Sequence, residues 1–134
     1  MEEKTANVLD KEIIRYEDHV NKKRFSWLKN QHLDFYLPDY NVAIECQGIQ
    51  HYEPIDFAGK GEVWAKRRLY TIKSLDKVKR DRCKDNFVFL EYIKYDEDVE
   101  ERVKEIIHKH NVRIQKDGKQ SVEELSNKAL DASS

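Results

Sequence analysis

The sequence has few cysteines, and this scarcity argues against a disulfide scaffold. Cys46 and Cys83 are the only two, and they form neither a CxxC pair nor part of a zinc-ligand cluster. Small secreted scaffolds carry several closely spaced cysteines, so a reducing, intracellular setting is the simpler interpretation.

Long hydrophobic runs are absent as well. No apolar stretch approaches the roughly 20 residues that a membrane-spanning helix needs. The start of the chain, MEEKTANVLDK, has neither a basic region nor an apolar core. We therefore expect no signal peptide, no membrane partner and a cytoplasmic location.

An excess of charge of one sign is also missing. The 25 Lys and Arg residues nearly balance 26 Asp and Glu, giving a formal net charge of −1. This balance excludes a globally basic nucleic-acid binder but leaves room for a local basic patch. With 134 residues, the chain can form one domain with a real core, but not two full domains.

The apolar pattern predicts an α/β domain with a mixed sheet, in the order α-β-β-β-α-β-α. Helices are expected over 3–11, 63–85 and 97–110, and strands within 12–20, 32–37, 42–47 and 86–93. The strand at 86–93 is apolar on both faces, which is typical of a central strand. Residues 1–111 should form the domain. Residues 112–134 should be a weakly structured extension or a short helix, with Ser121 and Glu124 as a capping box.

A short hairpin carries two acidic residues that need an explanation. Its strands contain HLDFYL and VAIECQ, and a turn centred on residues 39 and 40 pairs positions whose numbers sum to 79. Asp34 then lies opposite Glu45, with Cβ atoms about 5 Å apart. Two carboxylates at that spacing suit Mg²⁺ or Mn²⁺. The alternative is that this face is simply solvated and the two acids never meet, as a shift of one residue would cause.

The stretch LDFYLPDYNVAIECQGIQHY resembles the PD-(D/E)XK nuclease superfamily. That signature is an Asp on one strand and Asp/Glu-x-Lys on the next. The longer sequence of this stretch is similar to that of small bacterial and phage domains related to the very short patch repair endonuclease and the EDxHD homing endonucleases. The resemblance covers roughly residues 2 to 107, and it implies a restriction-endonuclease-like mixed sheet and Mg²⁺-dependent hydrolysis of DNA.

The resemblance also implies roles for individual residues. Asp34, Glu45 and the backbone carbonyl of Cys46 would be metal ligands, and His51 would act as acid and base or orient the attacking water. Gln47 stands where the family has lysine, and an amide can neither supply charge nor take a proton. An acid from the first helix sometimes joins such sites, and Glu2 and Glu3 are the candidates.

Basic residues gather in two places near these motifs. The helix expected at 63–85 holds nine Lys or Arg against two Asp between Val63 and Lys84, which is a plausible phosphate-binding face. The alternative is an ordinary solvated helix face. The segment KKRF adds charge beside the first motif strand. The residues we expect to contact DNA are Lys22, Lys23, Arg24, Lys73, Lys77 and Arg80, whereas His108 and His110 should be exposed and without function.

Three functions therefore compete. The first is a metal-dependent DNA endonuclease of repair, restriction or mobile-element type. A homodimer is expected if both strands are cut, and a separate protein or domain could read the DNA. The second is a nucleic-acid-binding module in which Gln47 marks lost catalysis. The third is an interaction domain in which the paired acids are incidental.

Overall fold

The computed structural model describes the backbone of residues 1–132 and the side chains of residues 1–118. A mixed four-stranded sheet lies at its centre, in the order β1-β2-β3-β4. The strands are β1 (Glu17–Val20), β2 (Leu33–Leu37), β3 (Val42–Gln47) and β4 (Phe89–Lys94). The first three strands run antiparallel, and β4 pairs parallel to β3. The predicted α/β class and order of elements are confirmed.

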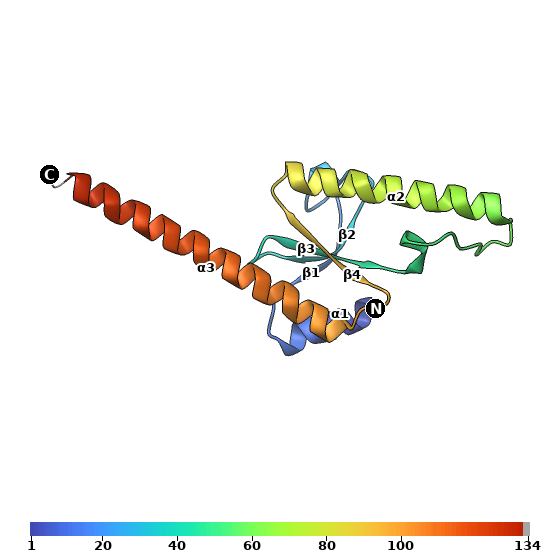
Figure 1. Cartoon of the computed structure of the whole chain (residues 1–134), viewed down its shortest axis with the longest axis horizontal. Helices are drawn as coiled ribbons and strands as arrows, with labels where there is room; N and C mark the ends of the chain where they lie inside the picture. The colour runs from blue at the N-terminus through green and yellow to red at the C-terminus, as the bar shows by residue number, and fades with distance from the viewer. Residues whose placement is uncertain (133–134) are drawn as a thin grey trace.

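Three helices flank the sheet, as Figure 1 shows. Helix α1 (Glu2–Lys11) and helix α3 (Val99–Ala132) cover one face, and helix α2 (Glu62–Asp85) covers the other. Two short 3₁₀ helices, η1 (Ser26–Leu28) and η2 (Ile49–His51), follow β1 and β3. The crossover from β3 to β4 runs through α2, as a parallel pair requires.

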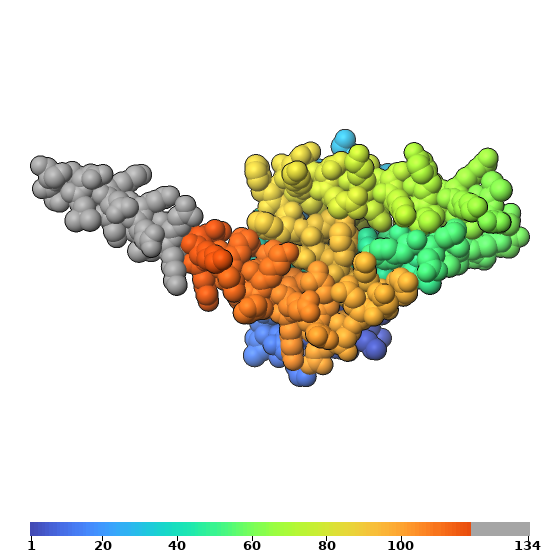
Figure 2. Space-filling model, in the orientation of Figure 1, coloured from blue at the N-terminus to red at the C-terminus, as the bar shows by residue number. Residues whose placement is uncertain are grey.

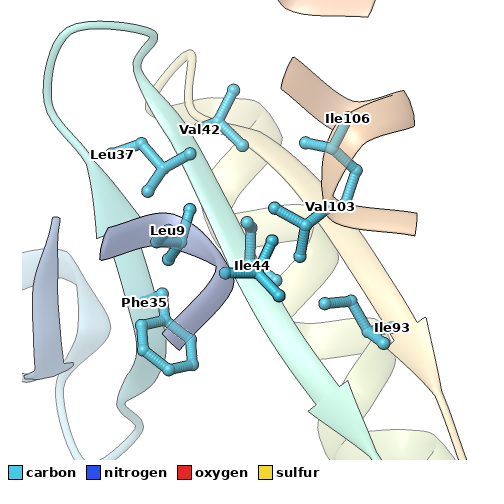
Figure 3. Close-up of a cluster of buried hydrophobic side chains, with 9 residues drawn as sticks. Leu9, Phe35, Leu37, Val42, Ile44, Ile93, Val103 and Ile106 are labelled. Carbon is cyan, nitrogen blue, oxygen red and sulfur yellow. The ribbon is translucent and has the colours of Figure 1, made fainter. Parts of the chain in front are cut away.

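Apolar alternation along the strands builds the main core on the face of α1 and α3. Figure 3 shows Phe35, Leu37, Val42 and Ile44 from the hairpin facing the helices. The remaining labelled residues of this cluster come from α1, β4 and α3, and they are Leu9, Ile93, Val103 and Ile106. Its interlocked side chains fix the hairpin relative to both helices.

A second, smaller cluster lies beneath α2. It consists of Val20, Leu28, Leu33, Tyr36, Ala43, Cys83 and Val88, all buried. The inward stripe of α2 is Ala65, Ile72, Asp76, Lys79 and Cys83, at spacings of three, four and seven residues. The apolar spacing of this helix in the sequence (Trp64, Leu69, Ile72, Leu75 and Val78) predicts an inward face that is partly wrong, since Leu75 and Val78 are 48% and 38% exposed.

The turn of the hairpin has the predicted register. Phe35 pairs with Ile44, Tyr36 with Ala43 and Leu37 with Val42, and each pair sums to 79. Asn41 takes a positive φ of 55°, a conformation that Asn tolerates well. Its side chain accepts a hydrogen bond from the Tyr36 hydroxyl and donates one to the Phe87 carbonyl, which links the turn to the start of β4.

The position of β4 differs from the expectation. Both of its faces are covered, as predicted, but it forms the edge of the sheet instead of the centre. The apolar faces arise because α2 packs on one side and α3 on the other. On the α3 side the buried Glu91 contacts Arg102 at 3.0 Å, Lys109 at 2.5 Å and His110 at 3.1 Å.

His110 was expected to be exposed, and this was wrong. Its side chain is only 2% exposed because it fills the space between Glu91 and Arg113. Periodicity alone could not reveal this, because the residue that attracts His110 lies on a distant strand. His108, by contrast, is exposed as expected.

The end of the chain continues α3 instead of forming a separate short helix, because the backbone remains helical from Val99 to Ala132. The expected capping box of Ser121 and Glu124 lies outside the residues whose side chains are described. Within residues 1–132, none of the helices combines the length and apolarity that crossing a bilayer requires.

Candidate metal and phosphate site

The carboxylates of the hairpin lie in one cavity of about 220 Å³ between the sheet and α2. Asp34 and Glu45 come from β2 and β3, at the end of the ladder where the next pair in register would be 34 and 45. Asp34 is 8% exposed and Glu45 is 6% exposed, so this face of the hairpin is covered instead of solvated. The other lining residues are Glu2, His32, Cys46, Gln47, His51, Asp76, Lys79 and Tyr92.

A backbone hydrogen bond positions Asp34. The amide nitrogen of Cys46 donates to Asp34 Oδ2 at 2.8 Å, so the carboxylate spans the gap to β3. Oδ1 is the other oxygen, and the imidazole of His32 lies 4.0 Å from it. One oxygen is thus used to hold the side chain, which leaves the other available for a cation or a substrate.

Glu45 has an unusual electrostatic environment. Burial raises the pKa of its carboxyl to about 8, and the neighbouring Asp34 adds to the rise. Lys79 opposes it, because the ammonium nitrogen lies 2.8 Å from Glu45 Oε1. A divalent cation at this place would favour the ionised carboxylate in the same way.

Lys79 supplies the positive charge that the resemblance led us to seek at position 47. It lies on α2, 34 residues from Glu45 in sequence, with its side chain 17% exposed. Sequence analysis counted it among the basic residues of this helix without separating it from them. Its place in the inward stripe of α2, between Ile72 and Cys83, was the available signal.

Gln47 is held in one orientation. The hydroxyl of Tyr52 donates a short hydrogen bond to Gln47 Oε1. The amide oxygen is therefore occupied, and the amide NH₂ group remains as the donor. Gln47 is 6% exposed and its side chain lines the cavity.

His51 forms a pair with an aspartate from α2. Its Nδ1 lies 2.8 Å from Asp76 Oδ2, and both side chains are mostly buried, at 23% and 18% exposure. If Nδ1 donates to Asp76, the other ring nitrogen, Nε2, is free to exchange a proton. Sequence analysis missed Asp76, because only the fold brings residue 76 beside residue 51.

A third residue that sequence analysis missed is Tyr92 of β4. Its hydroxyl is buried and has no hydrogen-bond partner among the described side chains. Burial is the largest cause of its raised pKa, and the neighbouring Arg80 opposes the rise, so the hydroxyl stays protonated and can donate. A buried donor on the cavity wall is a ready contact for a ligand oxygen.

The remaining predicted residues are placed unevenly. Glu2 lines the cavity, whereas Glu3 does not. The hydroxyl of Thr5, one turn along α1 from Glu2, lies 3.5 Å from the Cys46 sulfur, and this contact holds the start of α1 beside β3. Burial raises the pKa of Cys46 to about 11, so its thiol is protonated and does not act as a nucleophile. Among the side chains of residues 1–118, no group of three or more His, Cys, Asp or Glu is arranged to hold a metal.

The predicted DNA-binding residues divide into separate surfaces. Lys22 and Lys23 line a groove of about 430 Å³ beside His32. Arg24 instead pairs with Glu17 at 2.9 Å. Lys73 and Lys77 are exposed and line none of the cavities around the site, and Arg80 faces an apolar groove beside β4.

Comparisons with known proteins add nothing to this description. No protein-family model, curated protein or solved structure matches the chain. The functional argument therefore depends on the residues of the cavity.

Proposed function

We propose that the chain is a metal-dependent DNA endonuclease that hydrolyses phosphodiester bonds. The observation that carries the proposal is the burial of two carboxylates, Asp34 and Glu45, in one cavity with a lysine, Lys79. Buried like charges are costly unless a cation lies near them. The resemblance to the PD-(D/E)XK superfamily assigns this geometry to a nuclease.

The donor set fits a hard divalent cation. Mg²⁺ is commonly bound by one or two carboxylates together with waters and substrate phosphate. Asp34, Glu45 and the backbone carbonyl of Cys46 would hold it, and two carboxylates with waters and phosphate suffice without a cluster of three ligand side chains. A bound Mg²⁺ or Mn²⁺ would lower the pKa of water and neutralise charge on the phosphate.

The residues around the carboxylates have roles that follow from their contacts. His51, oriented through Nδ1 by Asp76, would take the proton of the attacking water or return one to the leaving oxygen. Lys79, the Gln47 amide and the Tyr92 hydroxyl would donate to the phosphate oxygens as negative charge develops. No single one of these groups replaces the family lysine, but together they supply its charge and its hydrogen bonds.

The second candidate is a nucleic-acid-binding module that has lost catalysis. Gln47 favours it, because the tight hydrogen bond from Tyr52 gives this residue a structural role. The two candidates differ in turnover alone. A cytoplasmic location suits both, and cutting both strands of a duplex would need two such cavities, and hence a homodimer or a partner protein.

A nuclease assay tests the proposal. Plasmid and branched DNA are incubated with wild-type protein in Mg²⁺, in Mn²⁺ and in EDTA, beside Glu45→Ala and the exposed control Glu101→Ala. We expect cleavage by wild type and the control in metal, and none by Glu45→Ala or in EDTA. Binding of DNA without cleavage by wild type in either metal would favour the module.

A further inference from the structure

A groove lined only by basic and neutral polar residues lies between β1 and β2. Its lining residues are His19, Asn21, Lys22, Lys23, Lys29, Asn30, Gln31 and His32, and no carboxylate is among them. The groove comes from His19 of β1 and from the connection that leads from β1 through η1 into β2. We call it the basic groove.

The basic groove continues into the candidate site. It shares Asn30, Gln31 and His32 with a second cavity of about 340 Å³ that runs along α2. That second cavity shares His32, His51, Asp76 and Lys79 with the cavity that contains the carboxylates. It is also lined by Arg68, which lies on α2 two turns before Asp76, so this cavity adds a positive charge to those of the basic groove. Figure 2 shows α2 lying along the segment that follows β3, and the helix contacts η2 there.

The charges of the basic groove are available to a ligand. Lys22, Lys23 and Lys29 are exposed, and none forms an ion pair with a carboxylate among the described side chains. By contrast, Lys11, Lys104 and Lys109 elsewhere on the protein are paired. Three free ammonium groups along one groove match a chain of phosphates.

The walls of the path are fixed to each other. Gln31 donates from Nε2 to the Leu75 carbonyl at 3.0 Å, which joins the basic groove to α2. Arg82 donates to the Leu28 carbonyl at 3.1 Å and to Gln31 Oε1 at 2.9 Å. Hydrogen bonds therefore hold the width of the path, and it does not open freely to admit a wide ligand.

The residues at the bottom of the candidate site, which we call its floor, are more buried than the residues that line the basic groove. Asp34, Glu45 and Gln47 are each less than a tenth exposed. A phosphate of a duplex is attached to a rigid, stacked helix whose grooves are about 6 and 12 Å wide. An unpaired strand can rotate about its backbone bonds and carry a single phosphate down to the floor.

From this geometry we infer that the basic groove and the site take an unpaired DNA strand, as in single-stranded DNA or a flap, in preference to an intact duplex. Cleavage of the bound strand rests on the proposed nuclease function, whereas binding of the strand does not. Lys22, Lys23 and Lys29 contact phosphates in the basic groove, and Arg68 contacts a phosphate in the cavity along α2. The Tyr92 hydroxyl and the Gln47 amide meet the phosphate at the floor.

Binding is measured by fluorescence anisotropy in EDTA, which prevents metal-dependent cleavage. The probes are one labelled oligonucleotide as a single strand and the same sequence as a blunt duplex. The variants are the triple change Lys22→Gln, Lys23→Gln and Lys29→Gln, and a matched triple change of exposed lysines on α1 and α3: Lys4→Gln, Lys11→Gln and Lys104→Gln. Circular dichroism checks that both variants are folded.

We expect the single strand to bind about 10-fold more tightly than the duplex. The groove variant should lose most of that affinity, and its salt slope should fall by about 2, or about 0.7 for each lost phosphate contact. The control variant on α1 and α3 should bind nearly as wild type does. Equal affinity for the duplex, or an equal loss in the control variant, would overturn the inference.

The outcome separates this inference from the proposed function. If groove-dependent binding of the single strand is found and no metal supports cleavage, then the inference stands and the nuclease proposal fails. If the protein cuts an intact duplex as fast as a flap, then the nuclease proposal stands and the inference fails.

Discussion

Lys79 Nζ lies 2.8 Å from Glu45 Oε1, in a cavity where both side chains are mostly buried. The lysine belongs to α2 and the glutamate to β3, so the ion pair joins the crossover helix to the hairpin. The contact partly offsets the repulsion between Asp34 and Glu45. It also holds the amine of Lys79 in the cavity that contains both carboxylates.

The first prediction concerns this lysine. Lys79→Met keeps the length of the side chain and removes the charge, so cleavage should fall by about 100-fold, as is typical when one stabilising donor is lost. Lys104→Met, an exposed change on α3, should leave cleavage unchanged. Initial rates on a labelled substrate at saturating metal give the comparison, and equal rates for Lys79→Met and wild type would remove Lys79 from the site.

The second prediction concerns the pH dependence of stability without metal. The pKa of Glu45 is raised from 4.5 to about 8 in the folded protein, so the folded state binds an extra proton between these values. Stability contributed by protonated Glu45 is therefore fully present below about pH 4.5 and is lost as the pH rises toward 8. Glu45→Gln stays neutral and lacks this loss.

We expect Glu45→Gln to gain stability over wild type between pH 5 and pH 8 by about 3 to 4 kcal/mol, since roughly 2.6 units of the pKa difference fall in this range and each unit corresponds to about 1.4 kcal/mol. The comparison across pH cancels the constant cost of leaving Lys79 unpaired. Urea unfolding in EDTA at both pH values is the measurement, with Glu101→Gln as the exposed control. A difference that does not change with pH would show that Glu45 is ionised throughout.

The third prediction concerns metal binding. Millimolar Mg²⁺ or Mn²⁺ should raise the melting temperature of wild type by mass action, because the unfolded chain has no preformed site. Glu45→Gln should show a much smaller rise, since one of the two carboxylates is gone. Equal shifts in both proteins, or none in either, would mean that Glu45 is not a ligand.

The fourth prediction concerns the pair formed by His51 and Asp76. Asp76→Asn should lower cleavage by about 100-fold, because an amide no longer fixes the tautomer or supports a charged imidazole. Asp81→Asn, an exposed change on the same helix, serves as the control. The pH profile of the rate should also shift in Asp76→Asn, whereas a purely structural role would lower the rate equally at every pH.

The sequence by itself determined the hairpin, and therefore the position of the two carboxylates, Asp34 and Glu45, in the candidate site. Strict alternation places Phe35 opposite Ile44 on the core face, and the same register places Asp34 and Glu45 on the other face. The turn chemistry of residues 38 to 41 fixes that register locally, so no distant contact is needed. The order of helices and strands follows from equally local patterns.

Tertiary structure alone decided which residues complete the site. Asp76, Lys79 and Tyr92 come from α2 and β4, and only the crossover connection brings them against the hairpin. The apolar spacing of α2 suggested a different inward face. Asp76 and Lys79 are polar, and they face inward because they pair with His51 and Glu45, which an apolar pattern does not reveal. Long-range pairing of charges has no period in the sequence, so His51 with Asp76 and Glu45 with Lys79 could be found only in the folded chain.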